Sequence, residues 1–186
     1  MRVIFFLLTL GFITDLYGLY SIWEKKPNFL FYNIFILIET LVIYNFFTKI
    51  INNSIFTKVC YCLTFIFILI WFFLIFQVGN EMYLNTCINF ENISILSFSI
   101  YYYYTVTIKK NISYIYEETK FWIVTAYFLN SAGTFFLYLY ISSLNRDDIE
   151  KYYTLNYVFT IIRTIVLSVA LLMKPPNKVD RQSIYL

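Results

Sequence analysis

The amino-acid sequence predicts an all-α fold, a polytopic transmembrane helical bundle of six spans with both termini in the cytoplasm. Of the 186 residues, 60% are hydrophobic and 13% are charged, whereas a soluble domain carries about 25% charged residues. The apolar residues gather in runs of about 18 or more, which is enough to cross a hydrocarbon layer of about 30 Å. We therefore assign residues 1–174 to the bundle and residues 175–186 to a polar cytoplasmic tail.

Hydropathy marks the six spans in chain order. The first begins after Arg2 and lacks a signal-peptidase motif, so we expect it to be retained as a helix. The second follows Pro27, which cannot continue a helix, and the third contains FIFILIWFFLIF, the most apolar stretch of the chain. Every connection is short, so neighbouring helices should be antiparallel. The predicted spans are residues 3–20, 29–47, 59–78, 87–108, 121–141 and 155–173.

The distribution of lysine and arginine predicts the orientation, because cytoplasmic loops carry an excess of both. The nine on the N-terminal side of the spans are Arg2, Lys49, Lys58, Lys109, Lys110, Lys120, Lys174, Lys178 and Arg181. The four on the opposite side are Lys25, Lys26, Arg146 and Lys151. Both termini are therefore expected in the cytoplasm of a bacterium whose inner membrane holds the chain. The polar segment NRDDIE is expected to be an outward-facing loop.

Several function classes find no support in the sequence. It contains no histidine and no Cys-x-x-Cys pair, which removes histidine-based catalysis and the commonest zinc sites. No nucleotide-binding glycine motif occurs. A net charge of +3 without a long basic run argues against a nucleic-acid partner. We expect no catalytic residue, no metal and no cofactor.

Four polar residues fall in one layer of the predicted bundle. At about 1.5 Å per residue, Glu39 and Asn130 lie roughly 15 Å below the outer face, and Asp15 and Arg163 lie about 12 Å below it. A charge at the centre of a helix facing lipid costs about 2.5–3.5 kcal/mol on insertion scales. We therefore expect these side chains to face inward, with Arg163 paired to a carboxylate, Glu39 foremost. Glu91 is expected to reach the headgroups instead.

Helical spacing supports the inward orientation. Asn156, Thr160 and Arg163 follow i, i+4 and i+7 and form one polar stripe. Small residues on such faces allow helices to approach closely, and the expected helix-packing residues are Gly11, Gly18, Ser131 and Gly133. The polar layer serves either to fix which helices pair or to bind a ligand, an ion or a proton.

Four segments carry a resemblance to known proteins: FITDLYGLY, FLFYNIFILIETLVIYNFF, FWIVTAYFLNSAGTFFLYLY and YYTLNYVFTIIRTIVLSVALLMKP. Together they cover about half of the chain, in the first two and last two spans. The chain resembles a family of small, uncharacterised multi-pass inner-membrane proteins of Bacteroidota. The resemblance implies that Asp15, Glu39 and residues 130–134 lie at motif positions, and it implies no reaction.

We expect a non-enzymatic sensing, scaffolding or accessory subunit that works within the lipid bilayer, with a membrane-protein partner or a second copy of itself. Two alternatives stay open. A small transporter or channel would line its path with Asp15, Glu39 and Arg163. An intramembrane lipid-modifying enzyme would divide acid and base roles between Asp15 and Glu39.

Overall fold

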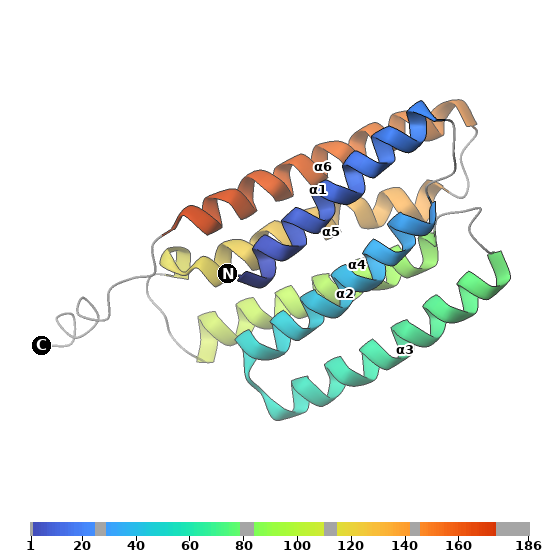
Figure 1. Ribbon diagram of the computed structural model, residues 1–186. Helices are drawn as coiled ribbons and strands as arrows, with labels where there is room; N and C mark the ends of the chain where they lie inside the picture. Colours follow the sequence, from blue (N-terminus) through green and yellow to red (C-terminus); the bar gives the residue numbers. More distant parts are fainter. Residues whose placement is uncertain (1, 25–28, 79–83, 110–114, 142–145, 174–186) are drawn as a thin grey trace, which may run out of the picture. The chain divides into compact units, whose positions relative to one another are not determined.

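The protein is helical throughout the part that the computed structural model describes, which is residues 2–24, 29–78, 84–109, 115–141 and 146–173. No strand occurs among these residues (Figure 1). The six long helices are α1 (Arg2–Trp23), α2 (Phe29–Ile51), α3 (Ser54–Val78), α4 (Asn85–Tyr104), α5 (Thr119–Ile141) and α6 (Arg146–Leu172). The π-helical segment η1 (Thr105–Lys109) continues α4, and the short 3-10 helix η2 (Ile115–Glu117) precedes α5. The predicted tail lies outside the described residues.

Each predicted span corresponds to one long helix, and the largest difference is at α6. This helix begins at Arg146, nine residues before the predicted span, so the expectation of a loop through NRDDIE is wrong for residues 146–150. The physical reason is that hydropathy detects only the apolar part of a helix. Backbone hydrogen bonds continue the helix into polar sequence, where hydropathy gives no signal.

Five helices are long and apolar enough to cross a membrane, as far as the described residues show. The segments that qualify are Ile4–Ser21, Phe29–Ile51, Ser54–Gln77, Thr119–Leu139 and Leu155–Leu172. The fourth predicted span is helical but does not qualify, because the first two turns of α4 contain Asn85, Asn89, Glu91 and Asn92. Composition alone thus supports five of the six expected spans.

The turn between α2 and α3 is only two residues long, and each residue has a distinct role. Asn52 has a φ of 50°, a left-handed conformation that commonly ends a helix and that asparagine tolerates better than most residues. Asn53 then caps α3, because its side-chain Oδ1 accepts hydrogen bonds from the N–H groups of Ile55 (2.9 Å) and Phe56 (3.2 Å). The Asn-Asn pair therefore stops one helix and starts the next.

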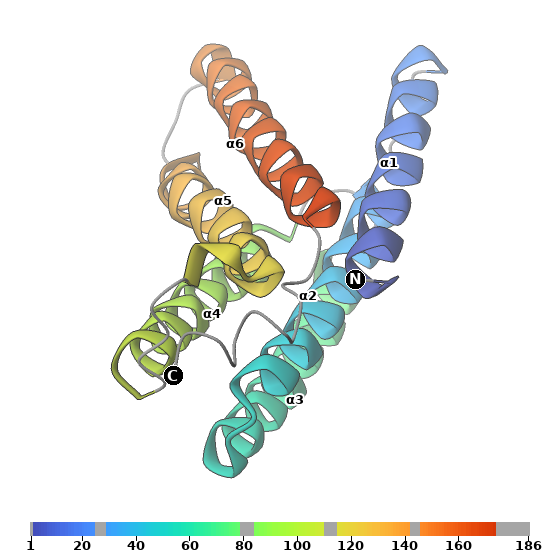
Figure 2. The same cartoon turned by 90° about the vertical axis from the view of Figure 1, so that its left-hand side faces the viewer.

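The contacts divide the chain into two units, residues 1–94 and 95–186, with the boundary inside α4. In the first unit α1 packs on α2 and α2 packs on α3, and these pairs lie side by side in Figures 1 and 2. The rings of Tyr17 and Phe31 are in contact, with centroids 3.9 Å apart and planes tilted by 34°, and join α1 to α2. In the second unit α5 packs along α6.

The second half of α4 contacts α5 through a tyrosine in the second unit. The Tyr103 ring lies between Phe121 and Phe128, with centroid separations of 5.8 and 6.0 Å. Its hydroxyl shares a 2.9 Å hydrogen bond with the hydroxyl of Thr125. Tyr103 therefore joins the two helices by both ring packing and a hydrogen bond.

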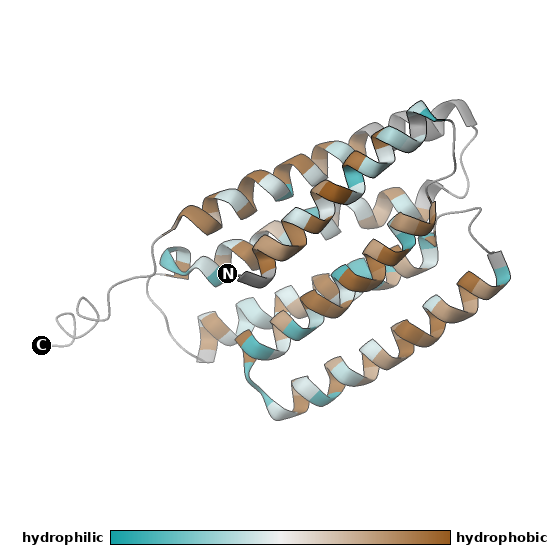
Figure 3. Ribbon diagram, in the orientation of Figure 1, coloured by the Kyte–Doolittle hydropathy of each residue, from teal (hydrophilic) through white to brown (hydrophobic). Residues whose placement is uncertain are grey.

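Helix α3 shows which surface the chain turns outward. Its buried side chains form one narrow stripe at spacings of four, seven and four residues: Phe56, Cys60, Phe67 and Trp71. Its exposed side chains are also apolar, including Phe65, Leu69, Phe72, Phe73 and Phe76. Figure 3 shows α3 as hydrophobic along most of its length. A helix that is apolar on every side is typical of a membrane span.

Candidate functional site

The structure places the predicted polar residues at different degrees of burial. Glu39 is buried, with 8% of its surface exposed. Asn130, Asn156, Thr160 and Arg163 are half-buried, as expected of side chains on inward-facing stripes. A buried salt bridge is present among the described residues, which confirms the expectation of a buried ion pair in that general form. The pairing of Arg163 with a particular carboxylate stays a prediction.

Asp15 differs from the expectation, because it is exposed. The buried stripe of α1 runs through Leu7, Thr14, Gly18 and Ser21. Successive residues in a helix are separated by about 100°, so residue 15 lies at the edge of this stripe and not at its centre. The side chain still takes part in an interaction, so exposure does not leave its charge isolated.

The best-defined polar centre of the first unit is Asn33, which sequence reasoning missed. This residue is completely buried on α2. Its side-chain Oδ1 accepts a hydrogen bond from the Leu84 N–H (3.2 Å), and its backbone carbonyl accepts one from the Trp71 indole Nε1–H (2.9 Å). One asparagine thus connects α2 with α3 and with the start of α4.

The hydrogen bond between Leu84 and Asn33 lies at the N-terminal end of α4. Leu84 precedes α4, and its carbonyl accepts from the N–H groups of Cys87 and Ile88, so it occupies the N-cap position. A leucine side chain cannot cap a helix, and unpaired N–H groups at a buried helix start are unfavourable. The Asn33 Oδ1 accepts from the N–H of the N-cap residue itself, so an acceptor on another helix satisfies one of these groups. The position of α4 along α2 is therefore set by a hydrogen bond.

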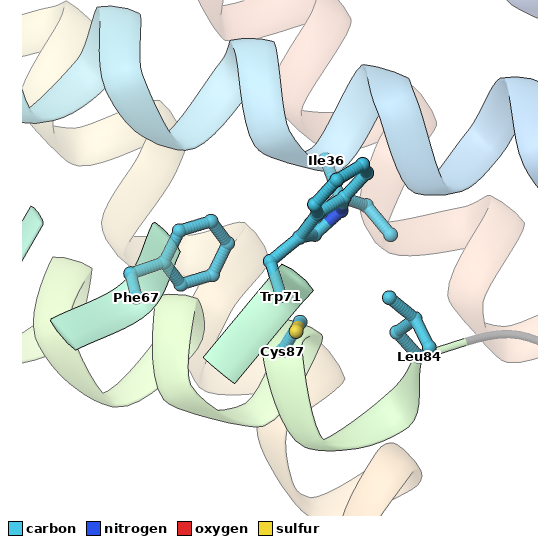
Figure 4. Close-up of a cluster of buried hydrophobic side chains, with 5 residues drawn as sticks. All are labelled: Ile36, Phe67, Trp71, Leu84 and Cys87. Carbon is cyan, nitrogen blue, oxygen red and sulfur yellow. The ribbon is translucent and has the colours of Figure 1, made fainter. Parts of the chain in front are cut away.

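Apolar packing surrounds this polar centre. Figure 4 shows a cluster to which α2 contributes Ile36, α3 contributes Phe67 and Trp71, and α4 with its N-cap contributes Cys87 and Leu84. All five side chains are buried. The Asn33 hydrogen bonds are therefore shielded from solvent, and such bonds are costly to break because no water can replace the lost partner.

Helix α4 turns its polar side chains inward. Glu91, Asn92, Ser94 and Ser99 are all buried, and Glu91 is only 6% exposed. The expectation that Glu91 reaches the headgroups is therefore wrong. The physical reason is helical spacing: Cys87, Glu91 and Ser94 follow i, i+4 and i+7, so Glu91 shares the face of a fully buried cysteine.

Glu91 also lies close enough to Tyr44 on α2 and to Cys87 on its own helix for its charge to act on both side chains. Asn33, Thr40 and Tyr44 form the buried stripe of α2 that includes the contact with Leu84. Glu39 lies about 100° round the helix from Thr40, at the edge of this buried face.

Many serine and threonine hydroxyl groups of the described helices already donate their proton to a backbone carbonyl four residues earlier. Thr40 donates to Ile36 (2.8 Å), and Ser94 donates to Phe90 (2.8 Å). The same pattern holds for Thr14, Thr64, Thr134 and Thr160. A hydroxyl has one proton, so these groups can accept a hydrogen bond from a ligand but cannot donate one.

In the second unit the α5–α6 contact involves three of the predicted residues, Arg163, Ser131 and Gly133, and two that were missed, Tyr127 and Phe159. The Arg163 guanidinium carbon lies 5.6 Å from the ring centroid of Tyr127, a cation–π contact. Gly133 lies at a close contact between the helices, because a Cβ atom added there would collide with the Phe159 ring. Ser131 is fully buried beside it. Gly11, in the first unit, has an ordinary distance of 3.5 Å from its Cβ position to Phe35.

The described residues contain no group of three or more histidine, cysteine, aspartate or glutamate side chains that could hold a metal ion. All three cysteines are free thiols; Cys60 and Cys87 are buried and Cys62 is exposed. No protein-family model matches the chain, and neither do any curated protein sequences or solved structures. Function must therefore be argued from the arrangement of these residues.

Replacing Asn33 with leucine should lower the free energy of unfolding by about 1–3 kcal/mol, because the Leu84 N–H is left buried without an acceptor. Thermal unfolding of the purified protein in a mild detergent measures the change. Asn45→Leu is the matched control, since Asn45 is an exposed asparagine on the same helix and its replacement should change stability little. Equal stability of the Asn33 variant and wild type would contradict the proposed role of the amide.

Gly133 and Gly11 should respond oppositely to replacement by alanine. Gly133→Ala should lower the free energy of unfolding by about 1–3 kcal/mol, because the methyl group overlaps the Phe159 ring. Gly11→Ala should leave stability unchanged or raise it by up to about 1 kcal/mol, because alanine favours the helix and the site has room. The same unfolding assay compares them. A stable Gly133→Ala variant would show that α5 and α6 are further apart than described.

Proposed function

We propose that the protein is a six-span integral protein of a bacterial inner membrane with both termini in the cytoplasm. Five apolar helices support the membrane location. Four polar side chains of α4, including the charged Glu91, are buried, which is how membrane helices accommodate such residues, and this supports α4 as the sixth span. An even number of spans places both termini on one side. The excess of lysine and arginine on the N-terminal side, nine against four, supports the cytoplasm as that side.

Within that membrane we propose a non-enzymatic role as a scaffolding, sensing or accessory subunit. The observation that carries the proposal is Asn33, because this fully buried residue joins α2 to the start of α4 through its side chain and to α3 through its backbone carbonyl. Hydroxyl groups that donate to the backbone of their own helix support the same role, since their protons are not available to a ligand. A chain built in this manner presents a rigid apolar surface to lipid and to partner helices.

A small transporter or channel is the second candidate. Buried carboxylates in membrane spans commonly mark ion or proton pathways, and Glu39 is 8% exposed in the middle of α2. In that case the carboxylate of Glu39 would take part in conduction as well as in packing. The two functions therefore differ in whether removing its charge abolishes a flux.

Reconstitution into liposomes separates the two functions. The accessory role predicts that gradients of H⁺, Na⁺ and K⁺ decay at the same rate in liposomes with wild-type protein, with Glu39→Gln and without protein. A flux that wild type supports and Glu39→Gln abolishes, with unfolding temperatures of the two proteins unchanged, would establish transport and contradict the accessory role. The accessory role also predicts a bound protein or lipid partner in fixed stoichiometry after extraction into nanodiscs, whereas a chain that always purifies alone counts against it.

A further inference from the structure

One pair of buried oxygens in the second unit is not accounted for by the packing described above. The hydroxyl of Ser131 is fully buried, and no residue of the described chain forms a hydrogen bond with it. The side-chain oxygen of the preceding residue, Asn130, is also buried and has no hydrogen-bond partner among the described residues. Thr134, one turn further on, bonds instead to the Asn130 backbone carbonyl (2.8 Å). Buried polar atoms almost always have a partner, and exceptions commonly mark a bound water or ion.

The register of α5 against α6 shows what lies opposite these oxygens. Gly133 meets Phe159, and Tyr127 meets Arg163, so the helices are antiparallel and Ser131 lies level with Thr160. The Thr160 hydroxyl donates to the Asn156 carbonyl (3.0 Å), which leaves its oxygen able to accept. We call the residues that line this contact the α5–α6 seam: Tyr127, Asn130, Ser131 and Thr134 on α5, with Asn156, Thr160 and Arg163 on α6.

The charges and donors of the seam select the kind of ligand. A cation is disfavoured, because the Arg163 guanidinium lies over Tyr127, one helical turn from Ser131. An anion is disfavoured by the Asn130 side-chain oxygen and the Thr160 hydroxyl oxygen, which can only accept. Ser131 needs an acceptor, and the other two oxygens need donors. A small neutral molecule that both donates and accepts meets all three requirements.

We propose that the α5–α6 seam binds one water molecule. The water accepts a hydrogen bond from the Ser131 hydroxyl and donates to the Asn130 side-chain oxygen and to the Thr160 hydroxyl oxygen. Three hydrogen bonds are the usual number for a buried water, which is costly to remove. The site is independent of whether the protein transports ions, and its test does not use that activity.

The sign of the change in unfolding temperature caused by Ser131→Ala tests the proposal. If the water is present, Ser131→Ala removes one of its three bonds and should lower the unfolding temperature by about 2–4 °C. Asn130→Leu should lower it by a similar amount, and the double variant by less than the sum, because the same water is lost. Ser94→Ala is the control: that hydroxyl is buried but already bonded to Phe90, so its removal should change the temperature little.

An unoccupied seam gives the opposite result. Replacing a buried hydroxyl that truly lacks a partner removes a penalty, so Ser131→Ala would then leave the unfolding temperature unchanged or raise it. Additive effects of the two variants would likewise overturn the proposal. A density map that resolves ordered waters provides the direct check. A peak about 2.7–3.2 Å from both the Ser131 and Asn130 oxygens is expected, and its absence overturns the proposal.

Discussion

A polar group surrounded by apolar matter must find its hydrogen-bond partner within the protein, and this constraint organises the whole chain. Its clearest expression is Asn33. The Asn33 side-chain oxygen on α2 accepts from the N–H of Leu84, the N-cap residue of α4, while Trp71 donates to the backbone carbonyl of the same asparagine. Neither bond is made by residues near in sequence. Together they tie α2, α3 and the beginning of α4 into one arrangement, and the apolar cluster around Trp71 keeps competing water away.

The same constraint explains how the helices distribute their side chains. On α3 almost everything is apolar, and the buried stripe is distinguished from the outer face by packing alone. On α4 the polar residues are gathered on the buried side, so a helix too polar to qualify as a span by composition still turns few polar groups outward. Within the second unit the guanidinium of Arg163 lies against the Tyr127 ring, and Gly133 permits the close approach that the neighbouring contacts need.

Much of the fold could be predicted from the sequence, because crossing a membrane requires long runs of apolar residues, and such runs can be recognised in the sequence itself. Hence the positions of α2, α3 and α5 agree with the predicted spans to within a few residues at most ends. The onset of α6 could not be found in this way, because a helix continues into polar sequence without a hydropathy signal. Glu91 was misplaced although its i, i+4 and i+7 relation to Cys87 and Ser94 was available. Asn33 offered no such signal, since its partners, Trp71 and Leu84, are 38 and 51 residues away. Only the packing of three helices reveals its role.

Fluorescence quenching by lipids with brominated acyl chains tests most directly whether the bundle's faces are as described. Two single-tryptophan proteins form the comparison, one with Trp71 alone, which is 8% exposed, and one with Trp71→Phe and Phe73→Trp, at a position 61% exposed. The two positions are two residues apart along α3, so their depths in the bilayer are nearly equal and only the direction differs. The account predicts strong quenching at position 73 and weak quenching at position 71. Equal quenching at both positions would show that Trp71 faces lipid, and the arrangement around Asn33 could not then exist.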